Sequence, residues 1–98
     1  GAAIAICLAA EGYPDAPVTG KVISGLAETY RDVTVFHGGT KLDEAKNVIT
    51  SGGRVLFVTG LGVNLEAASE AANGAIGPTA INFPAMQYRP DIAWRALS

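Results

Sequence analysis

The sequence predicts an α+β domain, with a mostly antiparallel sheet, one main helix packed on it and a short C-terminal helix. Short runs rich in β-branched and aromatic residues alternate with glycine and proline turns, as strands and their connections do. Only one long segment, residues 64–77, has apolar residues at helical spacing. The chain has 98 residues and is 49% hydrophobic and 16% charged, so we expect one packed domain over residues 1–98.

The N-terminal half predicts strands joined by loops. Residues 2–9 are apolar at consecutive positions, which is typical of a strand covered on both faces. Proline and glycine make residues 12–20 a surface loop, and residues 21–26 form at most a short extended piece. The sequence Val-Thr-Val-Phe-His at 33–37 strongly predicts a strand, and residues 41–46 predict a charged, exposed connection.

The centre of the chain predicts an antiparallel hairpin. Its strands are residues 47–50 and 54–59, and Ser51-Gly52-Gly53 forms the turn between them. The second strand is apolar on both faces, so we expect it in the middle of the sheet.

The main helix has clear start and stop signals. Asn64 is a good N-cap, Glu66 in the first turn suits the helix dipole, and Gly77-Pro78 is a stop signal. The expected apolar stripe consists of Leu65, Ala68, Ala72 and Ile76. After the helix we expect a last strand at 80–83 and a short terminal helix at 92–97, capped by Asp91.

Charge and composition argue against several classes of function. The net charge is −2 and the seven Lys and Arg residues are spread along the chain, which gives no reason to propose a nucleic-acid partner. No apolar run is long enough to cross a bilayer, and residues 2–10 lack the preceding basic segment of a signal peptide. The single cysteine, Cys7, predicts a small buried hydrophobe in a reducing compartment. His37 has no second His or Cys at ligand spacing, which argues against a metal site.

The strongest candidate site is the stretch from Ser51 to Arg54. Small residues in a turn leave backbone N–H groups accessible, and such concave arrays attract anions. The guanidinium of Arg54 follows at once and suits a phosphate group. The alternative is a simple hairpin turn with a solvated arginine. A second glycine turn, Gly38-Gly39-Thr40, follows His37, and both turns line one cleft if their strands are adjacent.

Known chemical motifs are absent from the sequence. Neither the GxxxxGK[ST] nor the GxGxxG spacing occurs, and no nucleophile–base or paired-carboxylate arrangement can be argued. We therefore assign no catalytic residue. His37 is expected to be structural or to line the substrate site, because no partner for a general base is visible in the sequence.

Four stretches together resemble a known family. They are Leu8-Ala9-Ala10-Glu11-Gly12-Tyr13-Pro14, Val35-Phe36-His37-Gly38-Gly39-Thr40, Thr50-Ser51-Gly52-Gly53-Arg54-Val55-Leu56 and Tyr88-Arg89-Pro90-Asp91-Ile92. In this order and spacing, the chain resembles the C-terminal domain of the phosphoribosylamine–glycine ligases, members of the ATP-grasp superfamily. The likeness covers nearly the whole chain.

The resemblance implies a cytoplasmic, ATP- and magnesium-dependent ligase of de novo purine biosynthesis that joins glycine to 5-phosphoribosylamine. The magnesium ligands and most of the ATP site would lie in preceding ATP-grasp domains, so these 98 residues alone are not expected to be active. The implied role here is the phosphoribosyl side of the active site. Arg54 would pair with the 5-phosphate, and Ser51, Gly52, Gly53, His37, Gly39 and Thr40 would line or border it.

The chain departs from the family pattern at three positions. Asp15 stands where the family usually has Gly, Gly38 where it has Ala, and Pro90 where it often has a basic residue. None of these positions lies between Ser51 and Arg54. A second hypothesis stays open: a stand-alone, non-catalytic domain that binds a phosphorylated metabolite or a partner chain.

Overall fold

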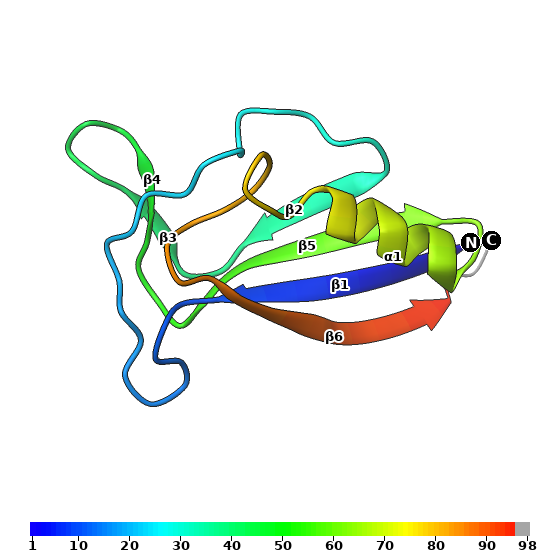
Figure 1. Cartoon of the computed structure of the whole chain (residues 1–98), viewed down its shortest axis with the longest axis horizontal. Coiled ribbons are helices and arrows are strands. Elements are labelled where there is room, and N and C mark those ends of the chain that lie inside the picture. The colour runs from blue at the N-terminus through cyan, green and yellow to red at the C-terminus, as the bar shows by residue number, and fades with distance from the viewer. Residues whose placement is uncertain (96–98) are drawn as a thin grey trace.

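The computed structural model describes residues 1–95, which form a sheet with one helix packed on it and a small separate hairpin (Figure 1). The α+β class predicted from the sequence is therefore confirmed. In chain order the elements are β1 (Ala2–Ala9), β2 (Val33–His37), β3 (Thr40–Leu42), β4 (Val48–Thr50), β5 (Arg54–Gly62), α1 (Leu65–Gly74) and β6 (Gln87–Arg95).

The main sheet has four strands in the order β2-β5-β1-β6, and every neighbouring pair is antiparallel. The central strand β5 pairs with β1 on one side and β2 on the other, as its apolar faces predicted. The strands β3 and β4 form a two-stranded sheet of their own. A register in which Ile6 lies opposite Val58 aligns the apolar residues of the two central strands.

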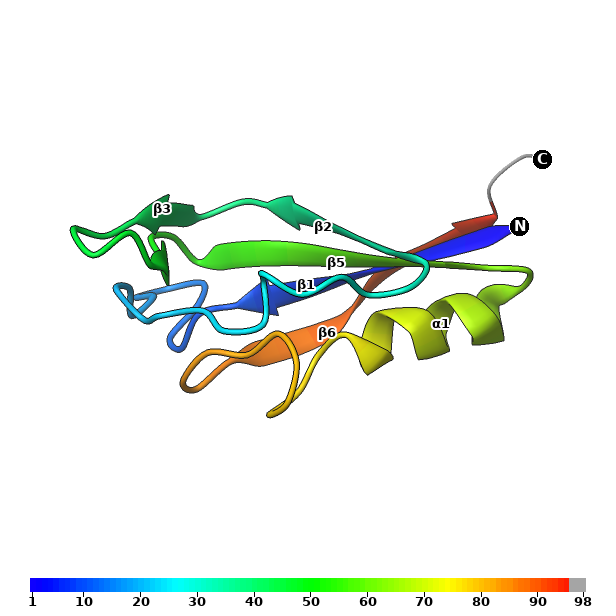
Figure 2. The same ribbon diagram turned by 90° about the horizontal axis from the view of Figure 1, so that it is seen from above.

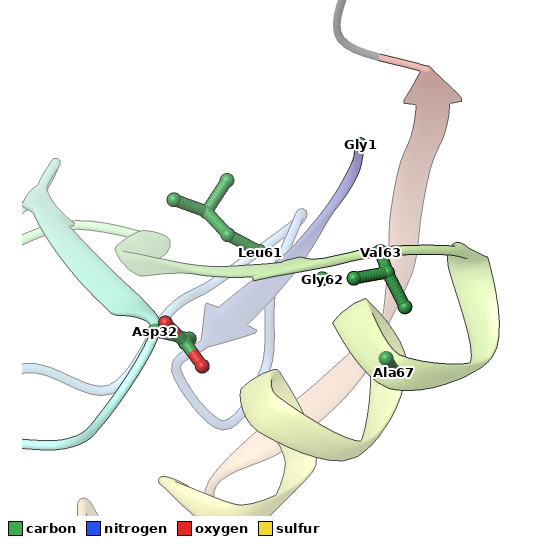
Figure 3. Close-up of a pocket in the computed structure, with 6 residues that line it drawn as sticks. All are labelled: Gly1, Asp32, Leu61, Gly62, Val63 and Ala67. Atoms are coloured by element: carbon green, nitrogen blue, oxygen red, sulfur yellow. The ribbon is translucent and has the colours of Figure 1, made fainter. Parts of the chain in front are cut away.

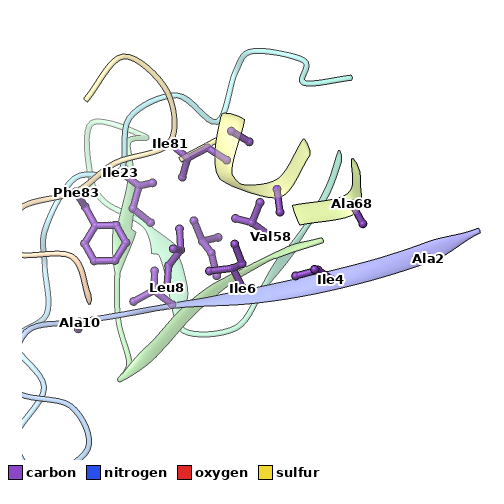
Figure 4. Packing of buried hydrophobic residues seen from close by; sticks show 14 residues of the cluster. Ala2, Ile4, Ile6, Leu8, Ala10, Ile23, Val58, Ala68, Ile81 and Phe83 are labelled. Carbon is purple, nitrogen blue, oxygen red and sulfur yellow. The ribbon is translucent and has the colours of Figure 1, made fainter. Parts of the chain in front are cut away.

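One face of β1 supplies much of the core. Ile4, Ile6 and Leu8 alternate along the strand and lie on the face of the sheet that α1 covers (Figure 4). Leu8 is fully buried. Ile81 and Phe83, from the segment after the helix, close the same cluster. The alternating positions between the core residues face the other side of the sheet.

A bulge in β5 changes which side chains face the core. Leu56 lies opposite Leu8, whereas Arg54 lies opposite Ala9, so Val55 is the extra residue in the register. Val55 and Leu56 are consecutive and yet both fully buried in the same cluster. Arg54 therefore belongs to the face opposite the core, together with Phe57.

The helix begins as its sequence predicts, but the predicted apolar stripe is confirmed only in part, since Leu65 is 44% exposed and Ile76 lies beyond the end of α1 at Gly74. The side chain of Asn64 accepts a hydrogen bond from the N–H of Ala67 at 2.8 Å and caps the helix. Ala68 and Ala72 are fully buried against the sheet. A Cβ on Gly60 would come too close to the backbone of Ala68 and Ala72, so only glycine lets the helix lie this near to β5.

The layers are visible in Figure 2, where α1 and the segment of residues 77–85 lie on the same side of the strands. The core is thin because alanines and glycines form much of the contact between helix and sheet.

Four sequence expectations are corrected. The connection predicted at residues 41–46 begins later, since Lys41 and Leu42 belong to strand β3. The predicted hairpin of residues 47–50 with 54–59 is wrong, since β4 pairs with β3 and β5 pairs with β1 and β2. Residues 80–83 form isolated bridges, at Asn82 with Ser24 and at Ile81 with Ile76, instead of a strand.

The short C-terminal helix expected at 92–97 is not found over residues 92–95, which belong to β6; residues 96–98 lie outside the described part of the chain. The edge of β1 offers backbone hydrogen bonds along its whole length, and this pairing outweighs the weak local helix signal. Pro90 fits because β6 is an edge strand whose register shifts at this point.

Candidate functional site

The turn of residues 51–54 joins the small hairpin to the central sheet, and the buried Thr50 anchors it. The N–H of Thr50 donates to the carbonyl of Lys21 at 2.9 Å, and the N–H of Lys21 donates to Oγ1 of Thr50 at 3.0 Å. The carbonyl of Thr50 also accepts a hydrogen bond from the N–H of Gly20 at 2.7 Å. Because all three polar groups of this buried residue are bonded, the position at which the turn begins is fixed.

The turn of residues 38–40 packs directly against the 51–54 turn. The N–H of Ser51 donates to the carbonyl of Gly39 at 2.8 Å, and the N–H of Gly39 donates to the carbonyl of Arg54 at 2.8 Å. A Cβ on Gly39 would lie only 2.7 Å from Cα of Gly52, so this approach requires glycine. The structure thus brings together the two glycine turns that the sequence singled out.

Within the 51–54 turn, the N–H of Ser51 is already bonded to Gly39, which the sequence did not indicate. Within residues 1–95, the N–H groups of Gly52 and Gly53 have no hydrogen-bond acceptor and are the ones available to an anion.

Arg54 is exposed and stands next to these N–H groups. Among the residues that the structure describes, the ion pair joins Arg31 and Asp32 at 3.8 Å. No carboxylate in that part of the chain therefore neutralises the charge of Arg54. An unpaired guanidinium beside two available amides is an arrangement that suits a phosphate or carboxylate.

Tyr13 is a neighbour of the turn that was not among the candidate site residues taken from the sequence. Its ring fills the space beside Gly53, where a Cβ would lie 2.8 Å from Cε1 and closer still to Cδ1. The loop is held there because the N–H of Ala10 donates to the carbonyl of Gly53 at 2.8 Å and that of Tyr13 to Ala10 at 3.1 Å. The sequence Gly12-Tyr13-Pro14, which belongs to one of the family-like stretches, was the feature that could have pointed to a role for this loop at the site.

His37 lies at the end of β2, and its Nδ1 is 2.9 Å from Oγ1 of Thr40 in a hydrogen bond across the glycine turn. Both side chains border the paired turns. Among the residues that the structure describes, His37 has no carboxylate partner, so its geometry favours a role in shaping the loop over one in proton transfer.

A hollow of about 540 Å³ lies at the other end of β5, lined by Gly1, Asp32, Leu61, Gly62, Val63 and Ala67 (Figure 3). Gly62 is eight positions from Arg54 along the strand, or roughly 26 Å at the usual rise per residue. The charged side chain in its lining is a carboxylate, so the hollow does not suit a phosphate.

A magnesium ion needs several oxygen ligands that converge on one point, and residues 1–95 supply no such set. No three His, Cys, Asp or Glu side chains converge there, so this part of the chain does not fit a magnesium site of its own. None of the helices in that range is long and apolar enough to cross a membrane.

Comparison with known proteins gives consistent matches. The family model "Phosphoribosylglycinamide synthetase, C domain" matches residues 3–95. A phosphoribosylamine–glycine ligase of Caulobacter vibrioides is 52% identical over 97 residues, which are 98% of this chain and 22% of that protein. The chloroplastic phosphoribosylamine–glycine ligase of Arabidopsis thaliana is 45% identical, with 97% of this chain and 18% of that protein covered.

A solved structure agrees with these matches. The crystal structure of the phosphoribosylamine–glycine ligase of Thermotoga maritima superposes with a TM-score of 0.76 at 34% identity, and the match covers 89% of this chain and 20% of that one. The chain thus spans about a fifth of the length of the relatives it matches. Since the family model and these relatives cover nearly all of its residues, the chain belongs to the phosphoribosylglycinamide synthetase C-domain family.

Proposed function

We propose that the chain is the C-terminal domain of a phosphoribosylamine–glycine ligase, which joins glycine to 5-phosphoribosylamine at the expense of ATP in de novo purine biosynthesis. Within that enzyme, the 51–54 turn binds the 5-phosphate. The observation that carries the assignment is Arg54, which is exposed, has no ion pair within residues 1–95 and lies beside the available N–H groups of Gly52 and Gly53.

The chemistry of the turn supports a phosphate over a neutral ligand. A guanidinium donates two parallel hydrogen bonds to phosphate oxygens, and neighbouring backbone N–H groups add partial positive charge. The turn is rigid before the ligand arrives, because Thr50 and the 38–40 turn hold it by backbone hydrogen bonds. Preorganised donors lose little entropy on binding.

The other predicted residues have supporting roles in this proposal. Gly39 and Ser51 tie the two turns together, and His37 and Thr40 border the site through their mutual hydrogen bond. The domain binds and orients the phosphoribosyl group and supplies no catalytic residue.

ATP and magnesium are the cofactors expected of the whole enzyme, and ATP supplies the energy of the carbon–nitrogen bond. Residues 1–95 lack a converging donor set for magnesium, so we assign its ligands, with the nucleotide site, to preceding ATP-grasp domains of the same polypeptide. The greater length of the relatives supports this arrangement over a stand-alone binding domain. The cytoplasm is the expected compartment.

The test is the substitution Arg54→Ala in the full-length protein. Losing a charge-assisted contact should cost roughly 1.5–3 kcal/mol, which is about a 10- to 150-fold fall in kcat/KM for phosphoribosylamine. The KM for ATP should stay within about twofold, because the nucleotide does not contact this turn. Steady-state kinetics with each substrate varied in turn measures both effects.

The matched control is Arg31→Ala. Arg31 is a fully exposed arginine two positions before Val33, which pairs with Gly60, six positions along β5 from Arg54. It should leave both substrate dependences unchanged. Arg54→Lys keeps the charge but loses the planar fork, so it should fall between wild type and Arg54→Ala. An Arg54→Ala enzyme with normal use of phosphoribosylamine would remove the assignment.

A further inference from the structure

The sheet has one covered face and one open face. The core face carries α1, and the alternating positions between the core residues form what we call the open face. Register places Ala3 opposite Leu61 and Phe36 opposite Phe57, so side chains of three adjacent strands meet there. The open face includes Ala3 and Ala5 of β1, Phe57 and Leu61 of β5, and Thr34 and Phe36 of β2.

The six residues named for the open face are apolar apart from Thr34, and the exposed side chains among them lie on β2 and towards the end of β5, whereas Ala3 of β1 is buried. Phe36 is 56% exposed and Leu61 is 46% exposed. These six residues include no charged side chain, and the charged residue that β5 contributes to this side is Arg54, at the end next to the 51–54 turn. Over residues 1–95, the helix packs on the opposite side of the strands, and no other element covers the open face (Figure 2). A contiguous apolar surface of this kind on a small domain marks an interface.

We propose that the open face is the contact surface for the preceding part of the same polypeptide. The inference rests on that part of the proposed function in which the chain closes a longer ligase, and it is independent of what the 51–54 turn binds. The relatives are about five times as long, so most of such a polypeptide is available to cover the face. In a longer chain the preceding residues are joined to Gly1, which is two positions from Ala3 of the face.

A covalent link of this kind favours the preceding domain over other partners. It gives that domain a high effective concentration at the open face, which a second copy of the chain lacks. Inter-domain contacts within one chain bury about 600–1,500 Å², an area that a sheet face of three strands can supply together with its edges.

The geometry also relates the open face to the candidate site. The bulge at Val55 returns Arg54 to the open face, where it lies opposite Ala9 beyond Phe57. A domain that covers Phe57 would therefore border the 51–54 turn. Ligand sites are common at such domain junctions, since both sides can contribute contacts.

The proposal is tested by cysteine labelling of the full-length protein. Thr34→Cys is a nearly isosteric probe on the open face, and Thr79→Cys is its control, because both threonines are exposed in this structure and Thr79 lies in the segment on the helix side. Maleimide labelling is followed at each cysteine by peptide mass spectrometry in native and denaturing buffer. We expect native Thr34→Cys to react at least tenfold more slowly than native Thr79→Cys.

A second pair of variants tests the energy of the contact. Phe36→Ser should lower the thermal midpoint of the full-length protein, whereas Leu42→Ser should leave it nearly unchanged. Both side chains are more than half exposed in this structure, at 56% and 63%, so a difference between the variants reports what covers Phe36.

Equal labelling of the two cysteines, or equal midpoints of the two serine variants, would overturn the proposal. Protection of Thr34→Cys that disappears when the protein is diluted to monomers would assign the face to a second copy instead. Neither readout involves substrate, so a negative result would leave the assignment of Arg54 to phosphate binding intact. Conversely, normal phosphoribosylamine kinetics of Arg54→Ala would leave the proposal for the open face intact.

Discussion

At the scale of single residues, the shape of the candidate site depends on a tyrosine ring and a glycine. Tyr13 occupies the space in which a side chain at position 53 would lie. Gly53 does not have a left-handed backbone, so the ring of Tyr13 is what excludes larger residues there. Because Arg54 follows directly, any shift of the ring or the turn moves its guanidinium.

We expect Gly53→Ala to destabilise the protein by about 1–3 kcal/mol, as overpacking against an ordered ring does. The same substitution in a Tyr13→Ala background should cost much less, because the clash is gone. Denaturant unfolding of the four proteins of this double-mutant cycle gives the coupling energy. Additive effects would show that Tyr13 and Gly53 do not constrain each other.

At the scale of elements, the β3–β4 hairpin depends on an acidic turn. Asp43 accepts hydrogen bonds from the backbone N–H of Asn47 at 2.8 Å and from its side-chain Nδ2 at 3.3 Å. These bonds, chiefly that from the backbone N–H, lower the pKa of the Asp43 carboxyl, because they favour its charged form. The turn positions the residues that lead into Thr50 and the 51–54 turn.

The lowered pKa of Asp43 determines how the stability that this residue contributes changes with pH. A carboxyl whose pKa is lower in the folded state contributes stability above its ordinary pKa of about 4, and this contribution is lost as the pH falls through the folded value. We expect an NMR titration to place the pKa of Asp43 below the ordinary value. Asn47→Ala should raise that pKa only part of the way, since alanine keeps the backbone N–H.

Asn73→Ala is the control for this titration, because the Asn73 side chain bonds to Ser69 in the helix and should not affect Asp43. An Asp43 pKa at or above the ordinary value in the wild-type protein would contradict the hydrogen-bonding account of the turn.

At the scale of the whole molecule, the helix and the sheet are in contact through their smallest residues. A Cβ on Gly60 would lie 2.5 Å from the N of Ala72 and 2.9 Å from its Cβ. Gly74 ends the same helix and has open space around its Cα. These two glycines therefore respond to the same substitution in opposite ways.

Gly60→Ala should lower the free energy of unfolding by about 1–3 kcal/mol, since backbone atoms of α1 cannot move aside without shifting the layer. Gly74→Ala should raise it by about 0.5–1 kcal/mol, because alanine loses less entropy in a helix. Chemical denaturation of both variants measures the difference. Destabilisation of equal size at both positions would mean that the layer spacing is not set by Gly60.

The sequence alone determined the features that depend on neighbouring residues. Residues 2–9, the core strand β5 and the helix cap at Asn64 could be predicted, because periodicity and capping are properties of a short segment. The turn Ser51-Gly52-Gly53 with Arg54 was identified in the same way, and its role in binding phosphate stays a prediction.

Only the tertiary structure decided which segments meet. The sequence does not show that β4 pairs with β3, that residues 92–95 complete the sheet as part of β6, or that Tyr13 packs on Gly53. Each of these contacts joins positions whose local signals are weak or ambiguous, and each exists because an open strand edge or a small residue accepts it. The physical reason is that strand pairing and close packing are selected by the whole core, which no local window of sequence contains.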